Sequence, residues 1–102
     1  MPTRITIELR AEEEDMTPEQ AGKDSAPGYA KAVRNVMTKA EGLWGWCNAK
    51  VEVTVLPGRK KGVVSSGTAY LGNCSYLSAE DFIKNSGYFE GMVKDALKEA
   101  LE

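Results

Sequence analysis

The sequence predicts an α+β fold, a two-layer sandwich with the order β-α-β-β-α. Its length of 102 residues, 42% hydrophobic and 27% charged, fits one domain, residues 1-102, with one core. Some segments alternate apolar and polar residues, which is typical of strands, and others repeat apolar residues at helical spacing. We therefore expect a three-stranded sheet covered on one face by two main helices.

The first strand is expected at residues 5–11 and the second, rich in valine, at residues 47–55. Residues 63–71 fit the returning arm of a hairpin, and Gly67 within them indicates a bulge or a close backbone approach. A right-handed crossover would make the first two strands parallel, with the third between them in the order 1-3-2. The other face would then be open and carry Thr6, Glu8, Arg10, Trp46, Asn48, Lys50 and Glu52.

Helix signals separate and follow these strands. Thr17, Pro18 and Gln20 have the spacing of a capping box and predict one helical turn. Apolar residues at helical spacing predict a helix over residues 29–40 and a clearer amphipathic one over residues 89–101. Ser78 is the expected N-cap of a short helix before the last one.

Composition excludes several functional classes. The chain carries 13 basic and 15 acidic side chains, a net charge of −2, and no histidine, the commonest general base and metal ligand. No apolar run approaches the roughly 20 residues of a membrane span, and no signal-type segment begins the chain. We therefore expect a cytoplasmic protein without membrane contact, enzymatic activity, catalytic residues, cofactor or metal.

The two cysteines have three alternative interpretations. A tight hairpin would bring Cys47 and Cys74 within a residue or two of facing each other. They could be small core hydrophobes, a disulfide or redox pair, or a catalytic thiol. A nucleophilic cysteine would need a helix N-terminus or a lysine to lower its pKa, because no histidine can activate it.

Two further clusters are candidates for binding. Trp44 and Trp46 fit either core packing or contact with a partner, a patch that Tyr70, Tyr76, Tyr88 and Phe89 could extend. Arg59, Lys60 and Lys61 form the one concentrated basic spot, expected at the hairpin tip. This spot fits either a solvated turn or a phosphate-contacting finger.

The second half of the chain carries a recurring pattern of aromatic residues, glycines and cysteines. It comprises residues 43–53 (LWGWCNAKVEV), 70–76 (YLGNCSY) and 87–92 (GYFEGM). This pattern resembles short proteins encoded by phages, prophages and plasmids. In size and in lacking enzymatic motifs, the chain is similar to inhibitors of host defence such as anti-CRISPR proteins, a resemblance that implies binding and occlusion of a host complex.

The sequence therefore favours a non-enzymatic interaction domain whose partner is a host protein or nucleoprotein complex. The expected contact residues are Glu12, Glu13, Glu14 and Asp15, which suit a basic groove, with Trp44 and Trp46 as apolar anchors. The alternative is a small nucleic-acid-binding module that uses Arg59, Lys60 and Lys61 together with the open face of the sheet. A thiol-dependent protein is a third hypothesis, and the chain could be a monomer or a homodimer.

Overall fold

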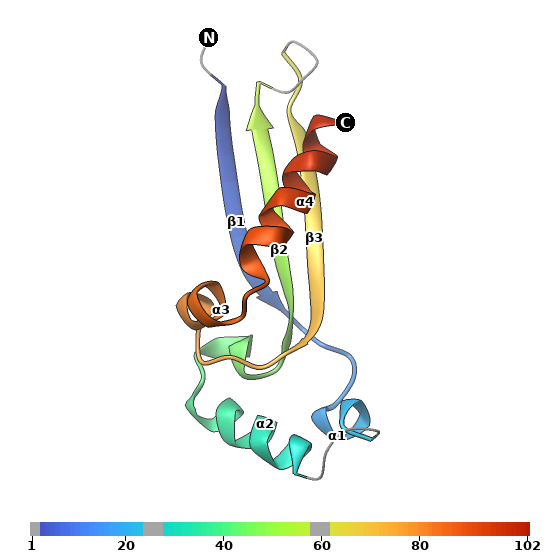
Figure 1. The fold of residues 1–102 in the computed structure, drawn as a ribbon, viewed down its shortest axis with the longest axis vertical. Helices are drawn as coiled ribbons and strands as arrows, with labels where there is room; N and C mark the ends of the chain where they lie inside the picture. The colour runs from blue at the N-terminus through green and yellow to red at the C-terminus, as the bar shows by residue number, and fades with distance from the viewer. Residues whose placement is uncertain (1–2, 24–27, 58–61) are drawn as a thin grey trace.

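The computed structural model describes residues 3–23, 28–57 and 62–102, and it has the predicted α+β architecture (Figure 1). Its elements, in chain order, are β1 (Arg4–Glu12), α1 (Pro18–Ala21), α2 (Tyr29–Lys39), η1 (Gly42–Gly45), β2 (Cys47–Leu56), β3 (Ser65–Cys74), α3 (Ala79–Asn85) and α4 (Phe89–Leu101).

The three strands form an antiparallel sheet in the order β1-β2-β3. Arg4 faces Leu56 and Glu12 faces Asn48, so β2 begins where β1 ends. The expected parallel pairing of the first two strands and the order 1-3-2 are therefore wrong. The physical reason lies in α2, which packs against α1 and η1 beyond the end of the strands and does not carry the chain back along the sheet.

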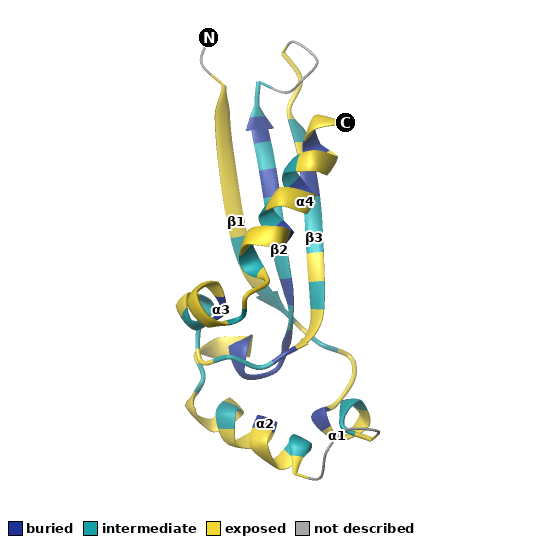
Figure 2. Ribbon diagram, in the orientation of Figure 1, coloured by how far each residue is buried: buried dark blue, intermediate teal, exposed yellow. Residues whose placement is uncertain are grey.

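The core lies between the sheet and α4. Along β2, every odd-numbered residue from Cys47 to Val55 is buried, as the alternation predicted (Figure 2). Met92, Ala96 and Ala100 recur every four residues on α4 and form its buried stripe. Of the two main helices, α4 therefore covers the sheet, with α3 against β1, while α2 lies at the end of the molecule.

Gly67 is the point of closest approach between α4 and β3. A Cβ atom there would lie 2.0 Å from the Ala96 carbonyl oxygen and 2.7 Å from the Ala100 nitrogen. Of the two alternatives that the sequence left open, the structure shows the close approach. Residues without a side chain allow helix and strand backbones to meet in this way.

A capping box, a hydrogen bond and an aromatic contact stabilise the end of the molecule that holds α1 and α2. Thr17 and Gln20 form the predicted capping box at α1. The Trp46 Nε1–H donates to the Met16 carbonyl oxygen at 2.6 Å, and the Trp46 ring meets the Tyr29 ring edge-on, with ring centres 6.4 Å apart.

The molecule as a whole is elongated, with dimensions of 53 × 24 × 20 Å. Its radius of gyration is 16.1 Å, whereas a compact domain of this length has a radius of gyration of about 13 Å.

Candidate functional site

The acidic segment, residues 12–15, leaves the end of β1 and is held in place at two points. Glu12 Oε2 lies 4.0 Å from Lys50 Nζ on the neighbouring strand. Glu14 Oε2 accepts a hydrogen bond of 3.2 Å from the backbone N–H of Asn73, the residue with a φ of 55° at the irregular end of β3. Glu13 and Asp15 are exposed. The exposed carboxylates of Glu13 and Asp15 therefore belong to a segment that contacts β2 through Glu12 and β3 through Glu14.

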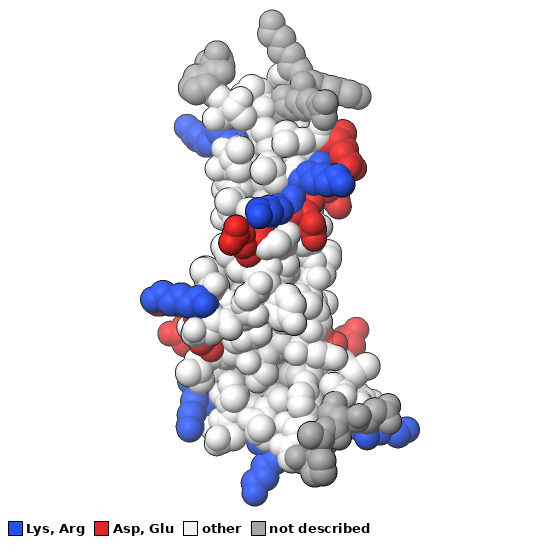
Figure 3. Space-filling view, in the orientation of Figure 1, with Lys and Arg blue, Asp and Glu red and all other residues white. Residues whose placement is uncertain are grey.

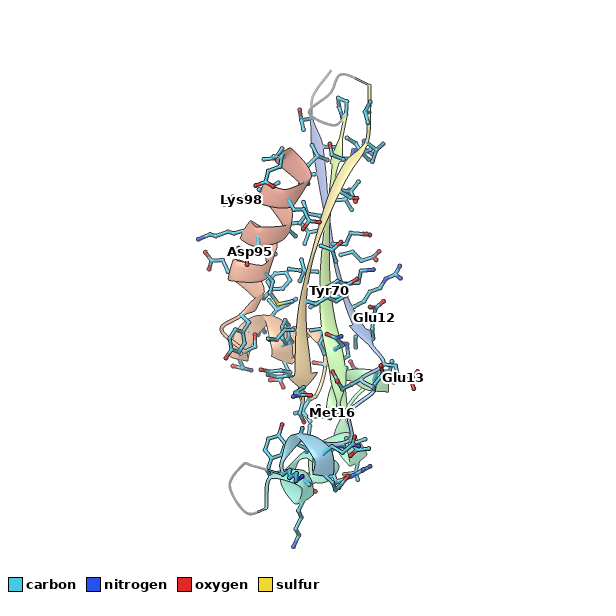
Figure 4. The ribbon with its side chains drawn as sticks, turned by 90° about the vertical axis from the view of Figure 1, so that its right-hand side faces the viewer. Glu12, Glu13, Met16, Tyr70, Asp95 and Lys98 are labelled. Carbon is cyan, nitrogen blue, oxygen red and sulfur yellow. The ribbon has the colours of Figure 1, made fainter. Side chains whose placement is uncertain are left out.

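Tyr70 lies beside this segment on the open face of the sheet. Lys50 faces Tyr70 across the strands, and its Nζ lies 5.8 Å from the centre of the tyrosine ring. The same ammonium group is the one near Glu12, so Glu12, Lys50 and Tyr70 form a continuous row. Figure 4 shows Glu12, Glu13 and Tyr70 on the side of the sheet away from α4, and Met16 beyond the lower end of the strands. Tyr70 is 57% exposed and Met16 is 43% exposed.

We define the acidic patch as Glu12, Glu13, Asp15, Met16 and Tyr70. It combines exposed carboxylates with two accessible apolar side chains, the mixture found in protein interfaces. Around it, the open face carries the predicted polar residues of the strands, including the Glu8–Arg10 ion pair at 2.5 Å. On this face, the basic residues of β1 and β2 are Arg4, Arg10 and Lys50, and the acidic residues are Glu8, Glu12 and Glu52. Positive and negative charges therefore alternate, and the described part of this face has no continuous basic area.

The two tryptophans do not belong to this surface. Trp44 is 9% exposed and its ring centre lies 5.6 Å from that of Phe82, and Trp46 is 8% exposed. The expectation that they anchor a partner, and that Trp46 lies on the open face, is corrected by this burial. Trp46 directly follows the η1 turn, whose geometry takes it out of the strand alternation, and Met16 supplies its hydrogen-bond partner.

The aromatic residues named with the tryptophans are also separated. Tyr76 packs edge-on against Phe82 with ring centres 5.1 Å apart, whereas Tyr70 is exposed on the opposite face. The sequence placed Lys50 on the open face but did not connect it with Tyr70 or Glu12, because that connection depends on the strand register. Met16 was missing from the sequence-based site. No sequence signal marks Met16.

Cys47 and Cys74 face each other across β2 and β3, which agrees with the prediction that a hairpin would bring them within a residue or two of facing each other. Both are free and buried. Burial, and secondarily the nearby Cys74, raises the pKa of the Cys47 thiol to about 12. Burial also raises the pKa of Cys74, whose Sγ–H points at the Leu71 carbonyl oxygen, 3.1 Å away. These environments favour core packing over a reactive thiolate, which needs a lowered pKa.

The basic residues Arg59, Lys60 and Lys61 lie outside the described residues. Within the described ranges, no group of three or more side chains able to ligate a metal lies together. None of the helices in this part of the chain has the length and apolar character needed to cross a membrane. No family model, curated protein or solved structure matches the chain.

Proposed function

We propose that this protein is an interaction domain that binds a basic surface of a host protein or nucleoprotein complex through the acidic patch. The observation that carries the proposal is the exposure of Glu13 and Asp15 in a segment whose other two carboxylates, on Glu12 and Glu14, contact β2 and β3. On this proposal, the protein is a mobile-element inhibitor of the anti-CRISPR kind, located in the host cytoplasm, and it acts by occlusion without chemistry.

Preorganisation supports binding through this segment. A flexible acidic loop would lose conformational entropy when it met a partner, at about 0.5–1.5 kcal/mol for each immobilised side chain. Here the Lys50 and Asn73 contacts already restrain Glu12 and Glu14. Exposed carboxylates of one sign attract a lysine- or arginine-rich groove and raise the association rate. Tyr70 then supplies apolar contact area at the edge of the charged group.

The nucleic-acid alternative has less support from the described surface. The residue pair that would favour it is Lys50 against Tyr70, because a base can stack on an exposed ring beside a cation. Glu12 and Glu52 flank the same strands, however, and a polyanion would meet their carboxylates. We therefore keep nucleic-acid binding as an outcome that the experiment must distinguish.

The test compares two double variants with the same change in net charge. Glu13→Gln with Asp15→Asn removes the two exposed charges of the acidic patch. Glu80→Gln with Glu90→Gln is the matched control, since these exposed carboxylates lie on α3 and α4. Tagged protein is used to capture partners from a bacterial lysate, and any captured partner is then purified and titrated.

We expect the control variant to bind like the unchanged protein. The patch variant should bind at least tenfold more weakly, with a shallower dependence on salt, because its long-range attraction is reduced. Equal binding by both variants would refute the assignment of the site. Binding of purified protein to DNA or RNA at low salt, with no protein partner captured, would refute the proposed function itself.

A further inference from the structure

The two outer strands of the sheet are protected unequally. On β3, carboxylates from elsewhere in the chain occupy two backbone N–H groups: Thr68 N–H donates to Glu99 Oε1 at 3.3 Å, and Asn73 N–H donates to Glu14 Oε2 at 3.2 Å. On β1, none of the hydrogen bonds between described residues joins a side chain to the backbone. An edge strand with unpaired backbone groups is a template for another strand. Among the described residues, the outer edge of β1 therefore lacks the side-chain cover that β3 has at Thr68 and Asn73.

The first half of β1 is also apolar on the face that α4 should cover. Ile5 is 51% exposed and Ile7 is 48% exposed, although both alternate with polar residues as core positions do. Figure 1 shows the reason: α4 crosses the sheet diagonally and approaches β3 toward its C-terminal end, which leaves the start of β1 uncovered. In Figure 3 the surface between α4 and this edge is mostly uncharged.

A shallow hollow on α4 adds further apolar surface. It is lined by Leu97 and Leu101 together with the stems of Lys94 and Lys98, and its lining is mainly apolar. Leu97 follows Val93 by one helical repeat, on the stripe next to the one buried against the sheet. The helix and the first half of β1 thus present partly exposed apolar residues on the same side of the sheet.

We propose that the first half of β1 pairs, antiparallel and across a two-fold axis, with the same segment of a second copy of this chain. The axis passes through Thr6, so Ile5 lies opposite Ile7 of the second copy, and Arg4 lies opposite Glu8 of the second copy. Two apolar pairs then lie on the helix side and two ion pairs on the open face. The combined sheet has six strands and loses its unprotected central edges.

Charge and shape select this register among those that keep apolar residues on one face. An axis through Ile7 would place Arg4 against Arg10, and an axis through Glu8 would place that carboxylate against itself. An axis through Leu9 would pair Glu8 with Arg10, but α3 packs on β1 and lies beside its second half (Figure 1). The Thr6 axis uses the free half of the strand and opposes unlike charges.

Association should be weak because the paired segment is short. Interfaces that bury less than about 1,200 Å² in total are typical of transient complexes. We expect a dissociation constant on the order of 10 to 100 μM. Sedimentation velocity of the full chain, from about 5 μM to about 1 mM, should therefore show a monomer that converts to a dimer with increasing concentration.

Charge reversal tests the register. Arg4→Glu alone places like charges together twice in a homodimer, and so does Glu8→Arg alone, so each should weaken dimerisation at least tenfold. An equimolar mixture of the two variants should dimerise again, because every introduced charge then meets an opposite one. Lys31→Glu and Glu41→Arg reverse exposed charges outside the strands, on α2 and just before η1, and serve as matched controls that should dimerise normally.

Circular dichroism confirms that each variant is folded before its association is measured. Should a variant fail to fold, hydrogen exchange on the unchanged protein replaces it: protection of the β1 amides should rise with concentration, while protection of the β3 amides stays constant. A monomer up to about 1 mM would overturn the proposal. So would a dimer that both charge reversals leave intact, or a mixture that stays monomeric.

Discussion

Gly67→Ala tests the packing of α4 on the sheet most directly. The added Cβ would lie 2.0 Å from the Ala96 carbonyl oxygen, 2.7 Å from the Ala100 nitrogen and 2.8 Å from the Glu99 Cβ. Two of these atoms belong to helix backbone, so they cannot move away as a side chain could. The last two turns of α4 must shift as a unit, and the contacts of Ala96 and Ala100 with the sheet are lost together.

The expected loss in the free energy of unfolding is about 3 kcal/mol, the upper end of the range for an overpacked core. With a urea m-value of about 1.5 kcal/mol/M, this lowers the unfolding midpoint by about 2 M. Gly91→Ala is the matched control, because a Cβ there meets no atom within 4 Å. In α4 this control should raise stability by about 0.5 kcal/mol through helix propensity. An unchanged midpoint for Gly67→Ala would refute the close approach of helix and strand.

Three further predictions concern the end of the molecule that holds α1 and α2, the α3 cap and the thiols. Trp46→Phe removes the indole N–H bonded to the Met16 carbonyl oxygen, so unfolding in urea should show a loss of about 1–2 kcal/mol, and an unchanged midpoint would contradict this bond. Ser78→Ala removes the hydroxyl that accepts from the Asp81 N–H and should cost about 1 kcal/mol in the same assay; a loss indistinguishable from zero would contradict the cap. Folding raises the pKa of Cys47 from 9.0 to about 12. Between these pH values the thiol ionises in the unfolded state but not in the folded state, which favours unfolding. The contribution of Cys47 to stability is therefore complete below pH 9 and is lost as the pH rises toward 12. Urea midpoints should therefore fall from pH 8 to pH 10.5, native protein should resist thiol-labelling reagents at pH 8, and rapid labelling of the folded protein would contradict the burial of both cysteines.

The helix caps and the strand alternation could be predicted from the sequence because each depends only on residues a few positions apart. The capping box at Thr17 needs residues three apart, and the Ser78 cap needs only its own helix. The alternation along β2 is read within one strand, and its buried face is the predicted one. Gly67 was recognisable as an unusual strand residue, although only the helix above it explains why a side chain is excluded there.

Relations between distant segments did not follow from local signals. A helix between two strands suggested a crossover, but α2 packs on α1 and η1, so the chain turns back and β2 runs antiparallel to β1. The burial of Trp46 depends on Met16 and Tyr29, which no periodicity connects to it. For the same reason, the acidic run was visible in the sequence while its restraint by Lys50 and Asn73 was not.

The two proposals use opposite ends of one strand, which makes them separable and also links them. Residues 12–15 follow the last residues of β1, and the proposed pairing uses Arg4 to Glu8. A dimer about Thr6 therefore carries its two acidic patches at far ends of an extended particle, and a partner with two basic sites far enough apart could engage both. Binding to such a partner would gain from effective concentration without any new contact. Arg4→Glu should then leave the affinity for a single site unchanged and remove only the added avidity, whereas loss of single-site binding would show that both proposals describe one surface.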